Sequence, residues 1–386
     1  MQIYVVQSGD TVDSIAEQQG IPADTIIYNN QLVTPYRLAV GQALLLSSGE
    51  MPPAADSRPR IHSNGYAYPF ISPWVLNETL PYLSELSIFS YGFTPEGNLV
   101  PPATEEGWMI ESARDAGAMA TLVLTPLGED GRFNNNLIHI LVTDLSAQQN
   151  LTRQLLQTMM EKGYGGLNLD FEYIMAQDRL GYAQFVGNAT RMMNLFGFHV
   201  SVALAPKYSD EQAGELYEGM DYALLGQAAN SVLLMTYEWG YTYGPPMAVA
   251  PIDQVRRVVE YALTRIPREK ISLGIPNYGY DWALPFERGI TRARTIGNVE
   301  AVQLAIFYGV EIQFEEAAQS PFFHYFQYGI EHVVWFEDVR SYQAAFDLIR
   351  EFGLRGVGYW QIMQLFRANW LLMADTFQIE KWNNGS

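Results

Sequence analysis

The chain has 386 residues, of which 48% are hydrophobic and 17% charged, with a formal net charge of −19 at pH 7 and no cysteine. These proportions are typical of a globular protein, and the acidic balance argues against binding to nucleic acid or anionic membranes, because both are bound mainly through lysine and arginine. The lack of cysteine excludes disulfides, thiolate metal ligands and a cysteine nucleophile.

The first segment, residues 2 to 47, predicts a small βααβ unit. Strands are expected at residues 4 to 6 and 43 to 46, and helices at residues 12 to 19 and 23 to 29. Gly9 supplies a turn before the first helix, and Thr11 is a suitable N-cap. Residues 1 to 20 lack the basic start, apolar run and cleavage site of a signal peptide, so no export signal is predicted.

Residues 48 to 62 are expected to form a linker. The stretch SSGEMPPAADSRPR is rich in Ser, Pro, Gly and Ala and has no apolar periodicity. The two ordered parts of the chain are therefore predicted to fold as separate domains, and removal of the first 50 residues is expected to leave cleavage of short soluble substrates intact.

The remaining chain, residues 63 to 378, alternates short apolar runs with amphipathic segments. Eight strands are predicted, at residues 65 to 70, 86 to 93, 120 to 126, 165 to 172, 199 to 206, 231 to 238, 271 to 280 and 356 to 362. Eight strands alternating with helices indicate an α/β fold, the (β/α)8 or TIM barrel. Because the gap between the last two strands is too long for one helix and contains strand-like pieces, a small α+β insertion is predicted at about residues 283 to 337.

Polar residues alternate with apolar ones in the fourth predicted strand, GGLNLDFE. Since side chains alternate across a strand, Asn168, Asp170 and Glu172 should face the barrel axis. Glu172, as the last residue of that strand, should lie at the carboxyl-terminal rim, where TIM-barrel active sites form. Two neighbouring carboxylates do not both ionise easily, so one is expected to stay protonated and serve as an acid. A buried structural network of these carboxylates is an equally good interpretation of the spacing alone.

Other residues near predicted strand ends are further candidates for substrate binding: Tyr91, Asn277, Tyr280 and Trp239. The five histidines show no HExxH or paired spacing, so no metal site is expected. No GxSxG elbow, P-loop or dinucleotide-type glycine string follows a strand, and no cofactor is predicted.

The segment YVVQSGDTVDSIAEQQGIPADTIIYNN, followed by LAVGQALLL, resembles a LysM module. Such modules bind glycans that contain N-acetylglucosamine. The resemblance implies contacts from the loops near residues 9 to 12 and 32 to 36, with Gly9, Asp10 and Thr11 as candidate glycan-binding residues. The same three residues could equally serve only to shape a turn and a helix cap.

YGGLNLDFE resembles the DGxDxDxE signature of the chitinase-type family 18 glycoside hydrolases, and the similarity extends over about residues 63 to 375. Matched by position, Gly166 is the signature glycine, Asn168 and Asp170 stand for the second and third aspartates, and Glu172 is the glutamate. Gly165 replaces the first aspartate. The resemblance implies that Glu172 is the general acid and base, and that Asp170 positions the N-acetyl group of the substrate.

Two further strands agree with this family. LLMTYEW resembles its MxYD segment, which implies that Met235 and Tyr237 line the catalytic subsite and that Tyr237 hydrogen-bonds the acetamido oxygen; Glu238 stands where aspartate is usual. Trp360, in GYW, resembles the indole that floors the sugar-binding subsite. A core position is the alternative for this tryptophan.

The resemblances together imply retaining, substrate-assisted hydrolysis of β-1,4 bonds after N-acetylglucosamine in peptidoglycan. The LysM segment with NLDFEY and MTYEWGYTYGPP is similar to the spore cortex-lytic N-acetylglucosaminidases, which lyse cortical fragments during germination, although those usually carry two LysM copies. This implies a monomer that binds peptidoglycan or chitin-like glycans in the spore coat, the cortex or the cell wall. The alternatives are a chitinase, a catalytically silent glycan-binding protein on the same fold, or a structural coat protein.

Overall fold

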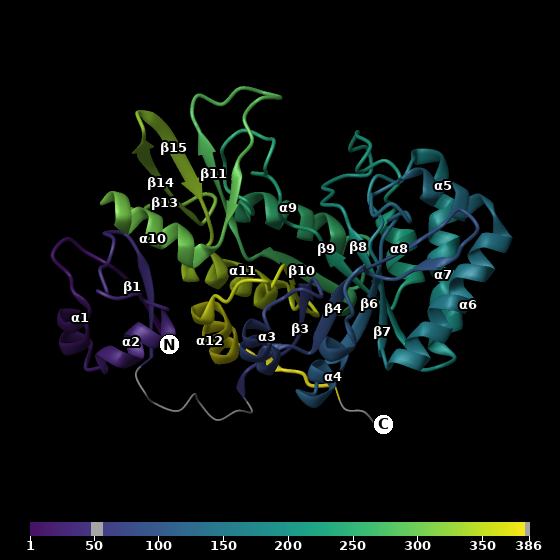
Figure 1. The fold of residues 1–386 in the computed structure, drawn as a ribbon, viewed down its shortest axis with the longest axis horizontal. Helices are drawn as coiled ribbons and strands as arrows, with labels where there is room; N and C mark the ends of the chain where they lie inside the picture. The colour runs from purple at the N-terminus through teal and green to yellow at the C-terminus, as the bar shows by residue number, and fades with distance from the viewer. Residues whose placement is uncertain (48–56, 383–386) are drawn as a thin grey trace.

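The computed structural model describes residues 1 to 47 and 57 to 382, so most of the predicted linker, residues 48 to 56, lies outside the described residues. Figure 1 shows a small N-terminal unit beside a large α/β domain, with an antiparallel sheet standing on one side of that domain. The predicted limits of the two domains are residues 2 to 47 and 63 to 378.

The N-terminal unit has the predicted βααβ order. It consists of β1 (Gln2–Val5), α1 (Val12–Gln19), α2 (Ala23–Asn29) and β2 (Ala43–Leu46), with β1 and β2 antiparallel. Thr11 caps α1, because its Oγ1 accepts a hydrogen bond from the backbone N–H of Ser14 at 3.0 Å. Gly20 ends this helix in the left-handed region, at φ 66°, where glycine is favoured.

The large domain is a closed barrel of eight parallel strands, and all eight predicted strands are found. They are β3 (Arg60–Ala67), β4 (Glu85–Phe93), β6 (Met119–Leu124), β7 (Gly166–Leu169), β8 (His199–Leu204), β9 (Ser231–Leu234), β10 (Ile271–Pro276) and β16 (Gly356–Trp360). The pairing of β3 with β4 closes the barrel. Two short strands flank it, β5 (Leu99–Val100) beside β4 and β17 (Gln378–Ile379) beside β3. Because Arg60 pairs with Gln378, β3 begins inside the predicted linker and β17 runs one residue past the predicted end of the domain.

Helices surround the barrel (Figure 1). The α-helices are α3 (Pro73–Thr79), α4 (Gly107–Asp115), α5 (Asn136–Thr143), α6 (Leu145–Lys162), α7 (Arg179–Asn194), α8 (Tyr222–Ala228), α9 (Ile252–Leu263), α11 (Val339–Phe352) and α12 (Arg367–Thr376). Among the described residues, short 3₁₀ turns cover Leu80–Tyr82, Ala176–Asp178 and Arg268–Lys270. The apolar faces of these helices and the outer faces of the strands form one continuous core.

The predicted insertion between the last two barrel strands is a five-stranded antiparallel sheet with one helix. Its elements are β11 (Gly279–Ala283), β12 (Arg294–Ile296), α10 (Asn298–Tyr308), β13 (Gln313–Glu315), β14 (Ser320–Gln327) and β15 (Ile330–Trp335). The sheet order is β12, β11, β15, β14, β13. The insertion begins at Gly279, a few residues before the predicted start, because residues 280 to 283 pair with β15 instead of extending β10.

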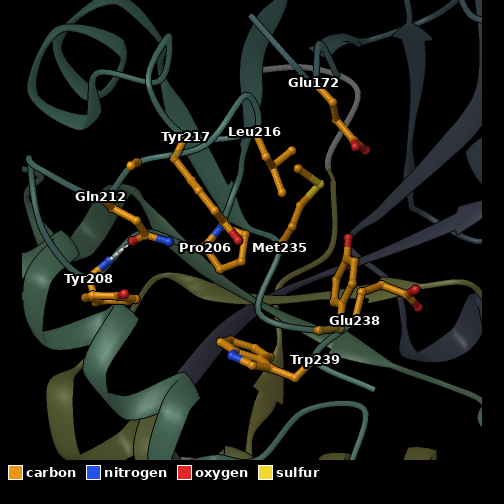
Figure 2. Close-up of a pocket in the computed structure, with 11 residues that line it drawn as sticks. Glu172, Pro206, Tyr208, Gln212, Leu216, Tyr217, Met235, Glu238 and Trp239 are labelled. Atoms are coloured by element: carbon orange, nitrogen blue, oxygen red, sulfur yellow. Dashed lines mark hydrogen bonds between the residues drawn. The ribbon is translucent and has the colours of Figure 1, made fainter. Parts of the chain in front are cut away.

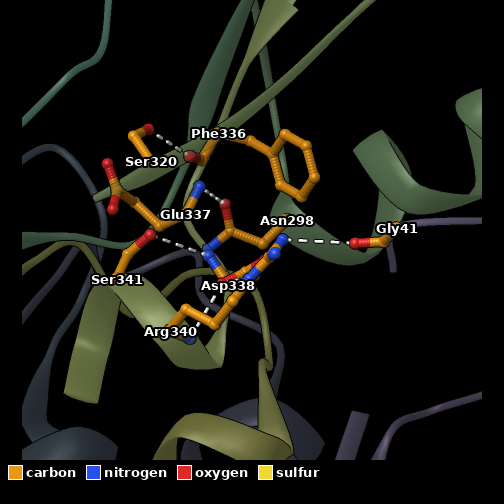
Figure 3. A network of polar contacts seen from close by, with 8 residues as sticks. All are labelled: Gly41, Asn298, Ser320, Phe336, Glu337, Asp338, Arg340 and Ser341. Carbon is orange, nitrogen blue, oxygen red and sulfur yellow. Dashed lines mark hydrogen bonds and ion pairs between the residues drawn. The ribbon is translucent and has the colours of Figure 1, made fainter. Parts of the chain in front are cut away.

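The N-terminal unit docks on the barrel domain and on the insertion. Leu45 is fully buried in the barrel core, and Ala39 is buried in the core of the insertion. The N–H of Ile312 donates to the carbonyl of Val40 at 2.9 Å. Arg340, at the start of α11, donates to the carbonyl of Gly41 at 3.2 Å while it pairs with the N-cap residue of that helix, Asp338, at 2.6 Å (Figure 3).

A second contact lies at the start of α12. The backbone N–H of Arg367 donates to Oε1 of Gln31 at 2.7 Å, and its guanidinium lies 4.0 Å from the centre of the Tyr28 ring and pairs with Glu78 of α3 at 2.9 Å. The two units are therefore in direct contact, through buried apolar groups and paired polar groups.

The docked arrangement predicts a single cooperative unfolding transition. Arg367→Ala removes the ion pair with Glu78 and the contact with Tyr28, so we expect the free energy of unfolding to fall by about 1 to 3 kcal/mol in urea titrations. Arg256→Ala, which removes a more exposed ion pair between α9 and Glu351 of α11, should change this free energy by less than about 1 kcal/mol. Two separate transitions, of which Arg367→Ala shifts only one, would contradict this picture.

Candidate active site

The polar face of β7 points into the barrel. Asn168 is fully buried, and its Nδ2 donates to Oγ of Ser201 on β8 at 2.8 Å. Asp170 follows the strand, held by its backbone N–H, which donates to the carbonyl of Leu124 on β6 at 3.0 Å. Only 9% of Asp170 is exposed, and its Oδ1 is buried without a hydrogen-bond partner among the described residues. Since Asp170 also lines a cavity, this oxygen is available to accept a hydrogen bond from a ligand.

Glu172 lies three residues beyond the end of β7, not at its last position as predicted. The apolar residue between the two acids fixes this segment: the ring of Phe171 stacks on Phe93 at 5.6 Å and on Tyr182 of α7 at 5.4 Å. With Phe171 anchored in the outer layer of the barrel, the side chains before and after it are free to face the opposite side. The next residue, Tyr173, has φ 54° and ends the extended segment.

Two cavities meet at Glu172. The larger, of about 690 Å³, also contains Asp170, Trp360, Tyr68 and Phe89. The smaller, of about 560 Å³, also contains Trp239, Tyr208 and Gln212, and Figure 2 shows the carboxylate of Glu172 at its edge. Both are lined by Leu216, Tyr217, Met235, Tyr237 and Glu238. The result is one cleft at the carboxyl ends of the strands, with Glu172 near its middle.

The carboxyl groups of this cleft have raised pKa values. Burial, and then the charge of Glu172, raise the pKa of Asp170. Burial, and then the charge of Glu238, raise the pKa of Glu172. No Lys, Arg or His is among the described residues that line either cavity. Without a cation the three acids cannot all ionise at low free energy, so protons are retained in the cleft near neutral pH.

Glu238 is held in place by two tyrosines from the start of the insertion. The hydroxyl groups of Tyr278 and Tyr280 both donate to its carboxylate, the latter at 2.9 Å to Oε1. Burial raises the pKa of Glu238, and these two hydrogen bonds oppose that rise. The backbone of Glu238 lies at φ 68°, a conformation rarely adopted by residues other than glycine, which turns the chain after β9. Tyr280 therefore belongs to the site through Glu238 and lines neither cavity.

Two predicted binding residues lie elsewhere, which corrects the sequence-based assignment. Tyr91 faces the surrounding helices, where its hydroxyl donates to Glu106. Asn277 points under the loop after β16, where its Nδ2 donates to the carbonyls of Gln361 and Gln364 at 3.1 and 2.9 Å. Both lie near strand ends, but their side chains are used to hold loops and helices. Asn168 is likewise beneath the cleft and does not line it.

The three candidate residues of the N-terminal unit have structural contacts of their own. Asp10 accepts hydrogen bonds from the Tyr4 hydroxyl at 2.8 Å and from the Gln7 N–H at 2.7 Å, which closes the turn that contains Gly9. Thr11 is the helix cap described above. These contacts agree with the turn-and-cap interpretation, and glycan binding by these residues stays a prediction.

Several residues of the cleft were not predicted. Tyr68 follows β3, and Phe89 lies in β4. The rings of both residues contact the Trp360 ring edge-on, with ring centres 6.1 and 5.0 Å apart. Both lie within predicted strands, at residues 65 to 70 and 86 to 93, but neither lies at the end of its strand. Tyr217 and Leu216 come from the long loop after β8, which carries no motif.

Gly165 stands where the family signature has its first aspartate, and the packing around it explains the difference. A Cβ at this position would lie 2.7 Å from Met119 and 2.8 Å from Trp382.

An acid at the rim of a TIM barrel, beside a second buried carboxyl group and over a tryptophan floor, defines a glycosidase-type cleft. Comparison with known families agrees. The family model described as "Glycosyl hydrolases family 18" matches residues 127 to 364, and the LysM domain model matches residues 4 to 47. The chain belongs to the family 18 glycosyl hydrolases and is a glycoside hydrolase with an N-terminal LysM domain.

Relatives match over the full length. The chain is 36% identical to the "Cortical fragment-lytic enzyme" of Bacillus subtilis and 36% identical to that of Bacillus anthracis, with 99% of each chain covered in both cases. Among solved structures, the spore cortex-lytic enzyme SleL of Bacillus cereus is 32% identical, with a TM-score of 0.93 and 99% of both chains covered. A chitinase from Chromobacterium violaceum shares the fold, with a TM-score of 0.75 and 22% identity over 82% of this chain and 98% of its own.

In the part of the chain that the structure describes, no group of three or more His, Cys, Asp or Glu side chains is arranged to hold a metal ion. Within the same residues, none of the helices has the length and apolar character needed to cross a membrane.

The raised pKa of Asp170 predicts how its replacement changes stability. The folded protein retains a proton that the unfolded chain releases above about pH 4. The contribution of the Asp170 carboxyl group to the free energy of unfolding is therefore fully present below pH 4, and it is lost as the pH rises through the pKa of this group in the folded protein. Asp170→Asn, which is neutral at every pH, should unfold at higher urea than the wild type at pH 8 and at similar urea at pH 4. The expected gain at pH 8 is about 1.4 kcal/mol for each unit by which the pKa is raised.

Glu161→Gln, an exposed change on α6, is the matched control and should show no such pH-dependent gain. If Asp170→Asn is destabilising to the same extent at both pH values, the carboxyl group is not strained by its burial and this description of the cleft is incorrect.

Proposed function

We propose that this protein hydrolyses β-1,4 bonds after N-acetylglucosamine in peptidoglycan, with net retention at the anomeric carbon. Support comes from the cleft described above and from the full-length relatives named as cortical fragment-lytic enzymes. On the same basis we propose spore cortex peptidoglycan as the substrate, lysis of cortical fragments during germination as the role, and the spore coat or cortex as the location.

The sugar that reacts is placed over Trp360 in the larger cavity. Its pyranose ring stacks on the indole, an arrangement that uses the aromatic surface well. Asp170, through the oxygen that has no protein partner, accepts the N–H of the 2-acetamido group. Tyr237, which lines both cavities, donates a hydrogen bond from its hydroxyl group to the acetamido oxygen and so orients that oxygen toward the anomeric carbon.

Bond cleavage needs a proton for the leaving oxygen and a nucleophile for the anomeric carbon. Glu172, kept protonated by its raised pKa, gives its proton to the glycosidic oxygen, and the acetamido oxygen attacks the anomeric carbon from the other face. The product is an oxazolinium-like ring, whose positive charge is stabilised by Asp170. This differs from ordinary retaining hydrolysis, in which a second carboxylate forms the covalent intermediate.

The second step reverses the proton transfer. Glu172, now ionised, removes a proton from water as the water attacks the anomeric carbon and opens the oxazolinium ring. The acetamido group is restored and the configuration at the anomeric carbon is retained. Glu238, fixed by Tyr278 and Tyr280, supports this cycle through its charge, which helps keep Glu172 protonated between turnovers.

One observation carries the proposal more than any other: Oδ1 of Asp170 is buried, has no partner among the described residues, and faces a cavity that also contains Glu172, Tyr237 and Trp360. Glu85, Asp178 and Glu337 also have a buried carboxylate oxygen without a partner, but none of them lines either cavity of the cleft, whereas Asp170 does. An acetamido N–H is a donor of suitable size for this oxygen.

The first test is Glu172→Gln. Because glutamine cannot donate a proton as an acid, the release of reducing ends from cortex peptidoglycan should fall by about 10²- to 10⁴-fold. Binding to insoluble peptidoglycan in a pull-down assay should be unchanged, since the cleft shape is preserved. The matched control is Glu211→Gln, an exposed change on the loop after β8, which should retain full activity. Activity of Glu172→Gln near the wild-type level would overturn the assignment of the acid.

The second test uses the pH profile. The charge of Glu238 contributes to the raised pKa of Glu172, and Glu172 acts first in its protonated form. Glu238→Gln removes that charge, so the pKa of Glu172 should fall and the alkaline limb of the kcat/KM profile should move to lower pH. An alkaline limb that stays in place or moves upward would show that Glu238 does not influence the acid.

A further inference from the structure

The aromatic surface of the larger cavity continues outside it. Tyr68, which lines the cavity beside Trp360, is followed two residues later by Phe70, whose ring stacks on that of Tyr68 at 5.1 Å with an interplanar angle of 20°. Phe70 is 68% exposed. A phenyl ring held in one orientation and left in solvent next to a binding cavity is a surface on which a ligand can stack.

The next exposed ring lies on the following helix. Trp74, in the first turn of α3, is 56% exposed. Glu78 lies four residues further on and therefore on the same face of the helix. The residue between Phe70 and the helix, Ile71, is buried in the core, so the loop that carries Phe70 is anchored to the barrel.

The face of α3 that carries Trp74 leads to the LysM domain. Glu78 pairs with Arg367 at the start of α12, and the guanidinium of Arg367 covers one face of Tyr28 on α2. In Figure 1, α12 lies between α2 and α3. Tyr28 is still 57% exposed. The loop that follows α2, residues 32 to 36, is the one expected to contact glycan, and in it Val33 and Tyr36 are exposed.

We propose that Phe70, Trp74 and Tyr28 form a binding path for the glycan strand that runs from the catalytic cleft to the LysM domain. This inference rests on the proposed function. The ligand is an N-acetylated glycan several sugars longer than the cleft holds, because the path lies outside the cleft. Each exposed aromatic ring of the path offers a face on which one pyranose ring can stack.

Two features of the path favour a glycan over other occupants. Its aromatic rings lie on three different segments, and the ion pair of Glu78 and Arg367 lies between α3 and Tyr28, whereas a protein interface gathers its apolar groups in one central patch. The rings are also fixed relative to the cleft, because the LysM domain is docked on the barrel through Arg367 and Arg340. A strand bound by the LysM domain is therefore held at a constant position relative to Glu172, which lowers the entropy lost when it enters the cleft.

Trp74→Ala is the most direct test, since Trp74 lines neither cavity of the cleft. Rates would be measured with the full chain on two neutral substrates, a short N-acetylglucosamine oligosaccharide that fills only the cleft and a long soluble N-acetylated glycan. We expect kcat/KM on the long glycan to fall about tenfold, mainly through KM, as expected for loss of one stacked sugar, and kcat/KM on the short one to stay within about twofold.

Phe70→Ala should also lower kcat/KM on the long glycan. Phe70→Trp, which keeps an aromatic ring at this position, should leave kcat/KM at the wild-type value. Phe307→Ala, which removes a ring that is 79% exposed on α10, is the matched control and should change neither rate. Equal losses on both substrates, or no loss on either, would overturn the binding path. If the wild type cleaves neither substrate nor peptidoglycan, the proposed function itself fails, which is a separate outcome.

Discussion

The structure depends on two carboxyl groups, Asp170 and Glu172, that the barrel removes from water without supplying a cation. The closed sheet surrounds the first, and the anchoring of Phe171 between Phe93 and Tyr182 sets the direction of the second. Burial raises the pKa of both carboxyl groups. Such an arrangement opposes folding, and it is tolerated where a ligand or a transition state makes use of it. The raised pKa values and the open oxygen of Asp170 follow from this constraint.

Most of the fold could be predicted because its signals are local. Alternating apolar runs identify all eight barrel strands and both helices of the LysM domain, and the long gap before β16 predicts the insertion. The errors concern the ends of elements. Residues 279 and 280 continue the apolar pattern of β10, but they pair with β15 and β12, and β3 begins early because β17 pairs with it. These are pairings between distant segments, which no local pattern contains.

The candidate site was predicted in part, and the same distinction explains the rest. Asp170, Glu172, Met235, Tyr237, Glu238, Trp239 and Trp360 line the cleft, and they were predicted from strand ends and from the resemblance to family 18. Tyr91 and Asn277 also lie near strand ends, but their side chains are occupied by Glu106 and by loop carbonyls. Loop residues such as Tyr217 had no signal. The docking of the LysM domain depends on Arg367 and Arg340, which have no special spacing, and it makes the module a fixed part of the enzyme.

The measurement that tests the central claim most directly compares two glycans of equal length, one fully N-acetylated and one fully N-deacetylated. If an acid pair closes a cleft in which the substrate supplies its own nucleophile, the acetylated glycan is hydrolysed and the deacetylated glycan is not, at any concentration that fills the cleft. Hydrolysis of both at similar rates would show that the attacking group belongs to the protein or to water, and the assignment of Asp170 would then be wrong.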